Sequence, residues 1–163
     1  MEGSEYLYTI AEVSVAFVGF AAIALAIRHR SHSLGNFERL LVAWLVERGL
    51  AALAFAFFPN LLYYFTGPPQ KILQYCSGLL AVYLLTAFIR VYLIFRNRQT
   101  TVPIGPVGRF LRVAMVGVMI PVQALAALGV LPFNALGWYL LGVTWLLVMS
   151  GATFATILTT RHS

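Results

Sequence analysis

Apolar runs of about twenty residues alternate along this chain with short polar stretches. A run of this length is what an α-helix needs to cross the ~30 Å hydrocarbon core of a membrane. Lipid satisfies no backbone hydrogen bonds, so helices are the open-chain way to span it. The pattern therefore predicts an all-α integral membrane bundle, a single transmembrane domain over residues 1–163, with five helices at about 7–27, 40–65, 72–95, 110–131 and 136–158.

The last two predicted helices are separated by only a few residues. Residues 110–158 would measure about 73 Å as one helix, which is enough for two membrane crossings. Pro132 and Asn134 predict a helix stop and a new N-cap between them. Within the fourth span, Pro121 followed by Gln123 predicts a kink with an amide near the freed carbonyl. A polar lining for a pathway is the alternative interpretation of Gln123.

Composition supports lipid as the solvent for most of the chain. Apolar residues make up 61% and charged residues 10% of the sequence, against about 45–50% and 25% in soluble domains. A globule of 163 residues has too little interior to bury such an excess. The lone Cys76 also excludes an internal disulfide framework.

Basic residues predict the orientation in the membrane. Eight of them flank the first and third connections or lie in the C-terminal tail, whereas Lys71 alone lies on the other side. The positive-inside rule then places the N-terminus outside and the C-terminus in the cytoplasm. We expect this basic face to meet anionic lipids, and the scatter of arginines at helix ends favours snorkelling over nucleic-acid binding. The eight are Arg28, Arg30, Arg39, Arg96, Arg98, Arg109, Arg112 and Arg161.

The residue inventory argues against catalysis. The chain has no Asp, and His29, His32 and His162 all lie outside the predicted spans. One cysteine provides no dithiol, and no zinc-protease, nucleophile-elbow or phosphate-loop motif occurs. The sequence predicts a non-enzymatic protein without catalytic residues, cofactor or metal. A pigment or haem ligand among His29 and His32 is the alternative to a solvated basic loop.

Four ionisable residues lie inside the predicted spans: Glu12, Glu47, Arg48 and Arg90. A charge at the bilayer centre costs about 2.5–3.5 kcal/mol on insertion scales, so all four should face protein or water. Their formal charges sum to zero, which suggests pairing. Depth counted at ~1.5 Å per residue predicts two interhelical pairs, Glu12–Arg48 and Glu47–Arg90, that fasten the first three helices together.

Two interpretations of these charges remain open. Charge pairs can fix the rotation and depth of helices in a bundle, and this structural role is favoured for Glu47 and Arg48. Intramembrane carboxylates can also relay protons or bind cations. Glu12 lies nearest the outer surface, and for it the structural and conducting roles are equally favoured.

Two stretches carry a resemblance to a known group of proteins. The segment "IAEVSVAFVGF", followed by a basic turn and "ERLLVAWLVERGLAALAF", resembles small uncharacterised bacterial inner-membrane proteins. They share a Glu-x6-Gly-Phe first helix and a Glu-Arg second helix, and "YLLGVTWLLVMSGATF" is a weaker match in the last helix. The resemblance implies a multi-pass protein of the bacterial inner membrane and implies no activity.

The functional hypothesis is a small channel or permeation subunit for protons or ions. Its pathway or buried charge network would use Glu12, Glu47, Arg48, Arg90 and Gln123. A homo-oligomer is expected, because five short helices leave little room for a pore within one bundle. The alternative is an accessory subunit of a larger membrane complex.

Overall fold

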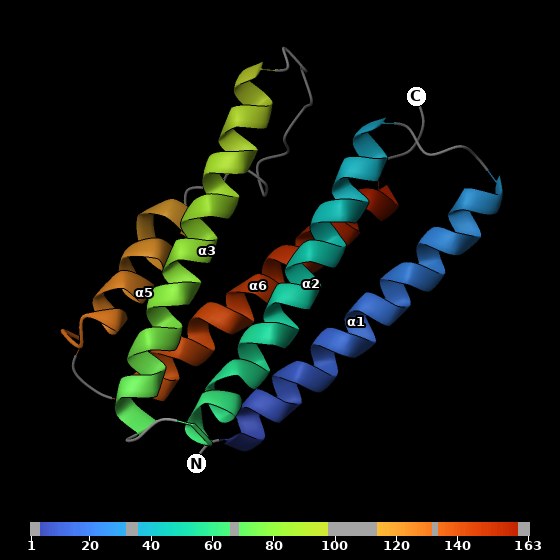
Figure 1. The fold of residues 1–163 in the computed structure, drawn as a ribbon. Coiled ribbons are helices and arrows are strands. Elements are labelled where there is room, and N and C mark those ends of the chain that lie inside the picture. The colour runs from blue at the N-terminus through green and yellow to red at the C-terminus, as the bar shows by residue number, and fades with distance from the viewer. Residues whose placement is uncertain (1–3, 32–35, 66–68, 98–113, 132–133, 160–163) are drawn as a thin grey trace. The chain divides into compact units, whose positions relative to one another are not determined.

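The structure is a computed structural model, and it describes residues 4–31, 36–65, 69–97, 114–131 and 134–159. Within these ranges the chain forms six helical segments and no strand. Figure 1 draws the chain as a ribbon and labels its α-helices. The prediction of an all-α fold is therefore confirmed for the described residues. The segments are α1 Ser4–Ser31, α2 Asn36–Tyr63, α3 Pro69–Asn97, the π-helix η1 Met115–Met119, α5 Ile120–Ala127 and α6 Ala135–Thr159.

Three of these helices are long and apolar enough to cross a membrane. The qualifying stretches are Arg39–Tyr63 in α2, Lys71–Leu93 in α3 and Ala135–Thr156 in α6. They match the second, third and fifth predicted spans. Helix α1 contains the first predicted span within its 28 residues.

The fourth predicted span is not a regular α-helix near Pro121, where the sequence predicted a kink. Its first residues, 110–113, lie outside the described part of the chain, and Gly117–Ala127 is a shorter apolar helix. The π-helix Met115–Met119 ends two residues before Pro121, which lies in the first turn of α5. Proline has no N–H and its ring crowds the carbonyl four residues earlier. A π-turn changes the local hydrogen-bond register, and such turns are a recognised source of helix bends.

Gly129 ends α5 in a Schellman motif. Its φ of 68° is a left-handed conformation that glycine adopts without strain. The Val130 N–H donates to the Leu125 carbonyl at 3.2 Å, and the Gly129 N–H donates to the Ala126 carbonyl at 3.1 Å. The predicted stop at Pro132 lies outside the described residues, and the helix already ends before it.

Asn134 caps the start of α6, as predicted. Its side-chain oxygen Oδ1 accepts a hydrogen bond from the Leu136 N–H at 3.1 Å. The Gly137 N–H donates to the Asn134 carbonyl at 3.0 Å. One of the free donors of the first helical turn is thereby satisfied by a side chain, which is the defining feature of an N-cap.

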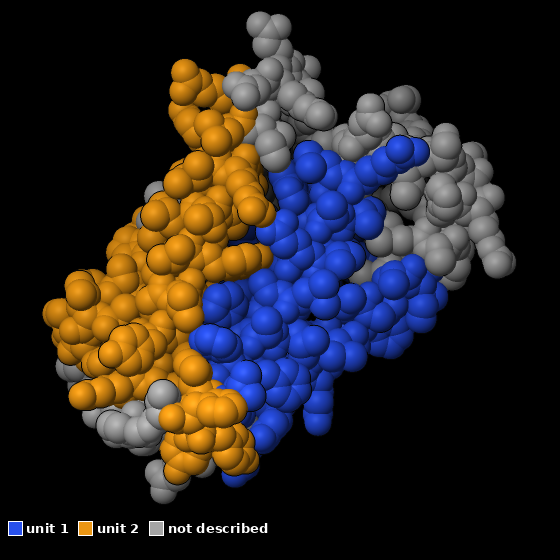
Figure 2. Space-filling view, in the orientation of Figure 1, with its two compact units in different colours: residues 1–61, 143–163 blue, residues 62–142 orange. Residues whose placement is uncertain are grey.

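The described chain divides into two compact units, coloured separately in Figure 2. The first comprises residues 1–61 and 143–163, and the second comprises residues 62–142. Helix α6 is continuous through the boundary, so its first turns belong to the second unit and the remainder to the first.

In the first unit, α1 and α2 pack antiparallel (Figure 1). Near one end the rings of Tyr8 and Phe57 meet edge to face, with their centroids 6.3 Å apart. Further along, Val18 packs against Gly49 so closely that a Cβ on Gly49 would overlap the Val18 side chain. Helix α6 joins them through a second edge-to-face pair, Phe17 and Phe154, with centroids 5.7 Å apart. This pair packs on a buried core of Leu41 and Leu45.

In the second unit, α3 packs along η1 and α5, and α6 begins beside them. Gly78 permits close approach, since a Cβ there would lie 3.5 Å from the Ala127 methyl group. Such small-residue contacts are the usual way that membrane helices pack closely. Ile72, Leu80 and Leu84 are the large aliphatic side chains of α3 that are fully buried.

Candidate functional site

The predicted site residues are distributed over both units. Glu12, Glu47 and Arg48 belong to the first unit, and Arg90 and Gln123 belong to the second. Glu12, Glu47 and Arg90 are exposed, Arg48 is half-buried, and Gln123 is fully buried. The predicted pair Glu47–Arg90 joins residues of different units and stays a prediction.

Arg48 is held between its own helix and α6. Its Nη1 atom donates a hydrogen bond to Thr153 Oγ1 at 3.0 Å. The Thr153 hydroxyl in turn donates to the Met149 carbonyl at 2.8 Å, which fixes its proton and leaves a lone pair for the guanidinium. The guanidinium carbon of Arg48 lies 5.8 Å from the centre of the Trp44 ring, within the range of a cation–π interaction. Arg48 therefore contributes to packing α2 against α6.

The local sequence explains this arrangement. Trp44 precedes Arg48 by four residues, so both side chains lie on one face of α2. Gly49 follows Arg48 and allows α1 to approach closely at Val18. The sequence alone showed the polar residues of α6, including Thr153, but gave no sign that Thr153 would meet Arg48. The spacing of three residues places Ser150 and Thr153 on one face of α6, which marks a polar face but not the residue that it contacts.

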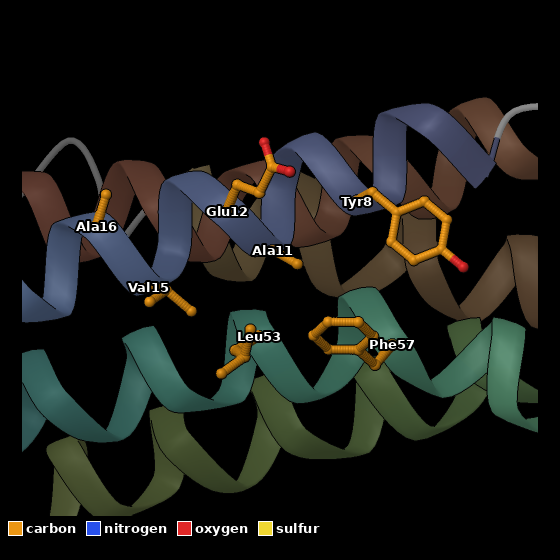
Figure 3. A pocket seen from close by; sticks show the side chains of 7 residues that line it. All are labelled: Tyr8, Ala11, Glu12, Val15, Ala16, Leu53 and Phe57. Carbon is orange, nitrogen blue, oxygen red and sulfur yellow. The ribbon is translucent and has the colours of Figure 1, made fainter.

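Glu12 lies in a groove between α1 and α2, the α1–α2 groove, shown in Figure 3. The groove has a volume of about 470 Å³. In Figure 3 the side chains of Val15, Leu53 and Phe57 lie between the two helices, whereas the Glu12 carboxylate points away from α2. Within the described residues, no hydrogen bond or ion pair is seen for this carboxylate. The lining residues are Tyr8, Ala11, Glu12, Val15, Ala16, Leu53 and Phe57.

The helix alignment bears on the predicted Glu12–Arg48 pair. Tyr8 lies against Phe57 and Val18 against Gly49, so Glu12 is level with Leu53, which lines the same groove. Leu53 and Arg48 are five residues apart, or about 7.5 Å along the helix. The pair stays a prediction, and this offset along the helix axis counts against direct contact. Counting residues for depth determined neither the offset between the two helices nor their rotation.

Gln123 connects α5 to the first turns of α6. Its Nε2 atom donates to the Trp138 carbonyl at 2.7 Å. Gly142, one turn further along α6, leaves this carbonyl accessible, since a Cβ at Gly142 would lie only 2.5 Å from Gln123 Nε2. The Oε1 atom of Gln123 is buried without a hydrogen-bond partner. Gln123 is thus an interhelical contact of the second unit, and Gly142 is the residue that makes it possible.

A cluster of metal-binding side chains is not seen in the described part of the chain. No group of three or more His, Cys, Asp or Glu side chains lies together there. The side chains of His29 and His32, the candidate pigment or haem ligands, lie outside the described part. Comparisons with family models, curated proteins and solved structures find no match to the chain.

Proposed function

We propose that this chain is a non-enzymatic, multi-pass protein of the bacterial inner membrane. It crosses the bilayer five times, with the N-terminus outside and the C-terminus in the cytoplasm. Three helices of sufficient length and apolarity support the membrane assignment. The resemblance of the first two helices to small bacterial inner-membrane proteins supports the assignment to the bacterial inner membrane.

Exposed side chains at the helix ends support the proposed orientation. Tyr6 at the start of α1 is 65% exposed, and Tyr8, two residues further along, is 48% exposed. Tyrosines at this level are typical of a membrane–water interface. Arg39 near the start of α2 and Arg96 near the end of α3 are also exposed. Basic residues at these ends are what the positive-inside rule expects of the cytoplasmic side.

The function we propose is a small homo-oligomeric channel for protons or cations. The observation that carries it is the Glu12 carboxylate, which is exposed on an apolar helix. In the hydrocarbon core an uncovered charge would cost about 2.5–3.5 kcal/mol. The carboxylate avoids this cost when a second copy of the chain shields it from lipid and a water-filled pathway between the copies solvates it.

The face of α1 around Glu12 suits contact between copies. Thr9, Glu12, Ala16, Gly19 and Ile23 are all exposed and recur at alternating spacings of three and four residues. Gly19 has nothing within 4 Å of where a Cβ would stand. Small residues on one helix face allow another helix to approach closely in a membrane.

An accessory subunit of a larger membrane complex is the second candidate. It is favoured by the α1–α2 groove, which lies on the surface and offers mainly apolar side chains to a neighbour. In this case the cover for Glu12 comes from a different protein. Oligomeric state separates the candidates: a symmetric ring of one chain in mild detergent supports the channel, and stoichiometric foreign subunits support the accessory role.

The decisive experiment measures proton and cation flux in liposomes over a range of pH. We expect flux from the parent protein and its loss in Glu12→Gln, which removes the charge while keeping the shape. Glu5→Gln is the matched control, since Glu5 is an exposed glutamate two turns earlier on α1. Absence of flux from the parent at every pH would exclude the channel, and equal loss in both variants would reject Glu12 as the working residue.

A further inference from the structure

We propose that the α1–α2 groove binds a small hydrophobic organic cation. The apolar body of the ligand would lie against Val15, Leu53 and Phe57, and Glu12 at the rim would hold its positive charge. The proposal rests on the function above in that Glu12 is the working carboxylate in both. It extends that function by naming the class of ligand that meets Glu12.

Charge determines the sign of the ligand. Glu12 is the one carboxylate or basic side chain among the seven lining residues, and six of them present apolar or aromatic surface. An anion would be repelled, and a neutral apolar molecule would leave the carboxylate uncovered. A cation with an apolar body can pair its charge with Glu12 and pack its apolar part against the other lining side chains. Its charge would form an ion pair with the exposed Glu12 carboxylate at the rim.

Aromatic rings reinforce the preference for a cation. Tyr8 and Phe57 contact each other edge to face at one end of the groove, with their planes 66° apart. Because the two rings are inclined to each other, their faces point in different directions. The face of an aromatic ring is negative and attracts a cation within about 6 Å. Recognition of bulky organic cations by aromatic rings follows from this attraction.

Size selects a small molecule over a lipid or a helix. From Tyr8 to Ala16 the groove follows nine residues of α1, a rise of about 12 Å. That is less than half of the ~30 Å hydrocarbon core that a transmembrane helix would follow. The volume of about 470 Å³ lies within the roughly 300–1,000 Å³ typical of sites for small ligands.

Equilibrium dialysis with tetraphenylphosphonium tests the proposal on the full-length protein in phosphatidylcholine nanodiscs. Tetraphenylborate is the matched probe, because it has the same shape and the opposite charge. We expect saturable binding of the cation alone. Glu12→Gln should weaken binding roughly ten- to hundredfold, the factor expected for one charge-assisted contact, whereas Glu12→Asp should retain binding because it keeps the charge.

Two further variants separate the groove from general surface charge. Glu5→Gln removes an exposed carboxylate of the same helix outside the groove and should leave binding unchanged. Val15→Phe adds bulk at an exposed lining position, 56% accessible, and should weaken binding by filling the groove. Size-exclusion profiles matching the parent show that each variant is folded.

Several results would overturn the proposal. These are no saturable binding of tetraphenylphosphonium, equal binding of tetraphenylborate, equal loss in Glu5→Gln, or unchanged binding in Glu12→Gln. Loss of binding when phosphatidylethanolamine is added to the nanodiscs would instead assign the groove to lipid. Dialysis measures binding without any flux, so the two proposals can fail separately. A protein that conducts but does not bind the cation refutes this inference, whereas one that binds the cation but does not conduct refutes the channel.

Discussion

Replacing Gly142 with alanine tests the contact that joins α5 to α6. The new Cβ would stand 2.5 Å from Gln123 Nε2 and 2.7 Å from Leu80 Cδ2. Carbon atoms do not approach so closely, so the amide or the leucine must move. Gln123 is fully buried, so its amide cannot move into solvent without a wider rearrangement. We therefore expect the hydrogen bond from Gln123 Nε2 to the Trp138 carbonyl, 2.7 Å long, to break or lengthen.

Three contributions determine the size of the effect. Overpacking a well-filled site costs about 1–3 kcal/mol. An interhelical hydrogen bond in a membrane protein contributes about 0.6 kcal/mol on average and up to about 1.7. Alanine gains up to about 1 kcal/mol over glycine in helix propensity. Together they predict that Gly142→Ala lowers the free energy of unfolding by about 1–4 kcal/mol.

Reversible unfolding in mixed micelles, followed by tryptophan fluorescence, measures this free energy. Gly137→Ala is the matched control on the same helix, because a Cβ at Gly137 has nothing within 4 Å. It should be neutral or stabilise by up to about 1 kcal/mol. If Gly142→Ala is as stable as Gly137→Ala, Gly142 does not lie as close to Gln123 as the structure places it.

A double-mutant cycle then tests whether the lost stability involves Gln123. Gln123→Ala removes the side chain that the new methyl group displaces. If the steric explanation holds, the double variant should be more stable than the sum of the single effects by about 0.5–3 kcal/mol, the range found for residues in contact. Additive effects would show that Gly142→Ala acts elsewhere.

The remaining predictions concern α1, α2 and the start of α6. Gly49→Ala should destabilise by about 1–3 kcal/mol through overlap with Val18, and Val18→Ala should restore part of the loss in unfolding titrations. Arg48→Leu and Glu12→Gln should have additive effects on unfolding, because about 7.5 Å along the helix separates their levels; a double variant more stable than this sum would show that they pair directly. Asn134→Ala should cost about 0.5–2 kcal/mol by removing the N-cap of α6, measured in the same way.

Each of these stability predictions has an internal control. Gly19→Ala places a methyl group on α1 where nothing lies within 4 Å, so it should not destabilise. Asn134→Asp keeps an oxygen in reach of the Leu136 N–H and should preserve stability. If Gly19→Ala costs as much as Gly49→Ala, or Asn134→Asp as much as Asn134→Ala, the assigned contacts are not the cause.

The sequence predicted helices well and their ends less well. The apolar pattern placed the second helix at 40–65, whereas α2 runs from Asn36 to Tyr63. The pattern detects the part of a helix that suits hydrocarbon, but hydrogen bonding continues the helix into polar residues beyond it. Asn134 was correctly assigned because an N-cap is a local property of the residue itself. Gly129, which ends α5, was missed although glycine after an apolar helix is a recognised stop signal.

Contacts between helices were the part that the sequence did not determine. Gln123 was expected to act beside Pro121 on its own helix, but its hydrogen bond reaches the Trp138 carbonyl on α6. That partner depends on Gly142, which leaves the carbonyl open. Residue counting gives the depth of a side chain in a membrane, but not the rotation of its helix or which backbone groups a neighbouring helix exposes.

Two of the three charged residues that the predicted spans place in the first unit, Arg48 and Glu12, differ in what already satisfies them. This difference separates a structural role from a functional one. Arg48 has a threonine hydroxyl on α6 and an aromatic face on α2, so its charge is accommodated within the bundle. Glu12 stands at the rim of an apolar groove with its carboxylate exposed. A half-buried charge with partners inside the bundle stabilises one arrangement of helices, whereas an exposed carboxylate on an apolar helix needs something from outside the unit. Water, a second copy or a hydrophobic cation would each meet that need, and the flux, oligomer and dialysis measurements distinguish them at this one residue.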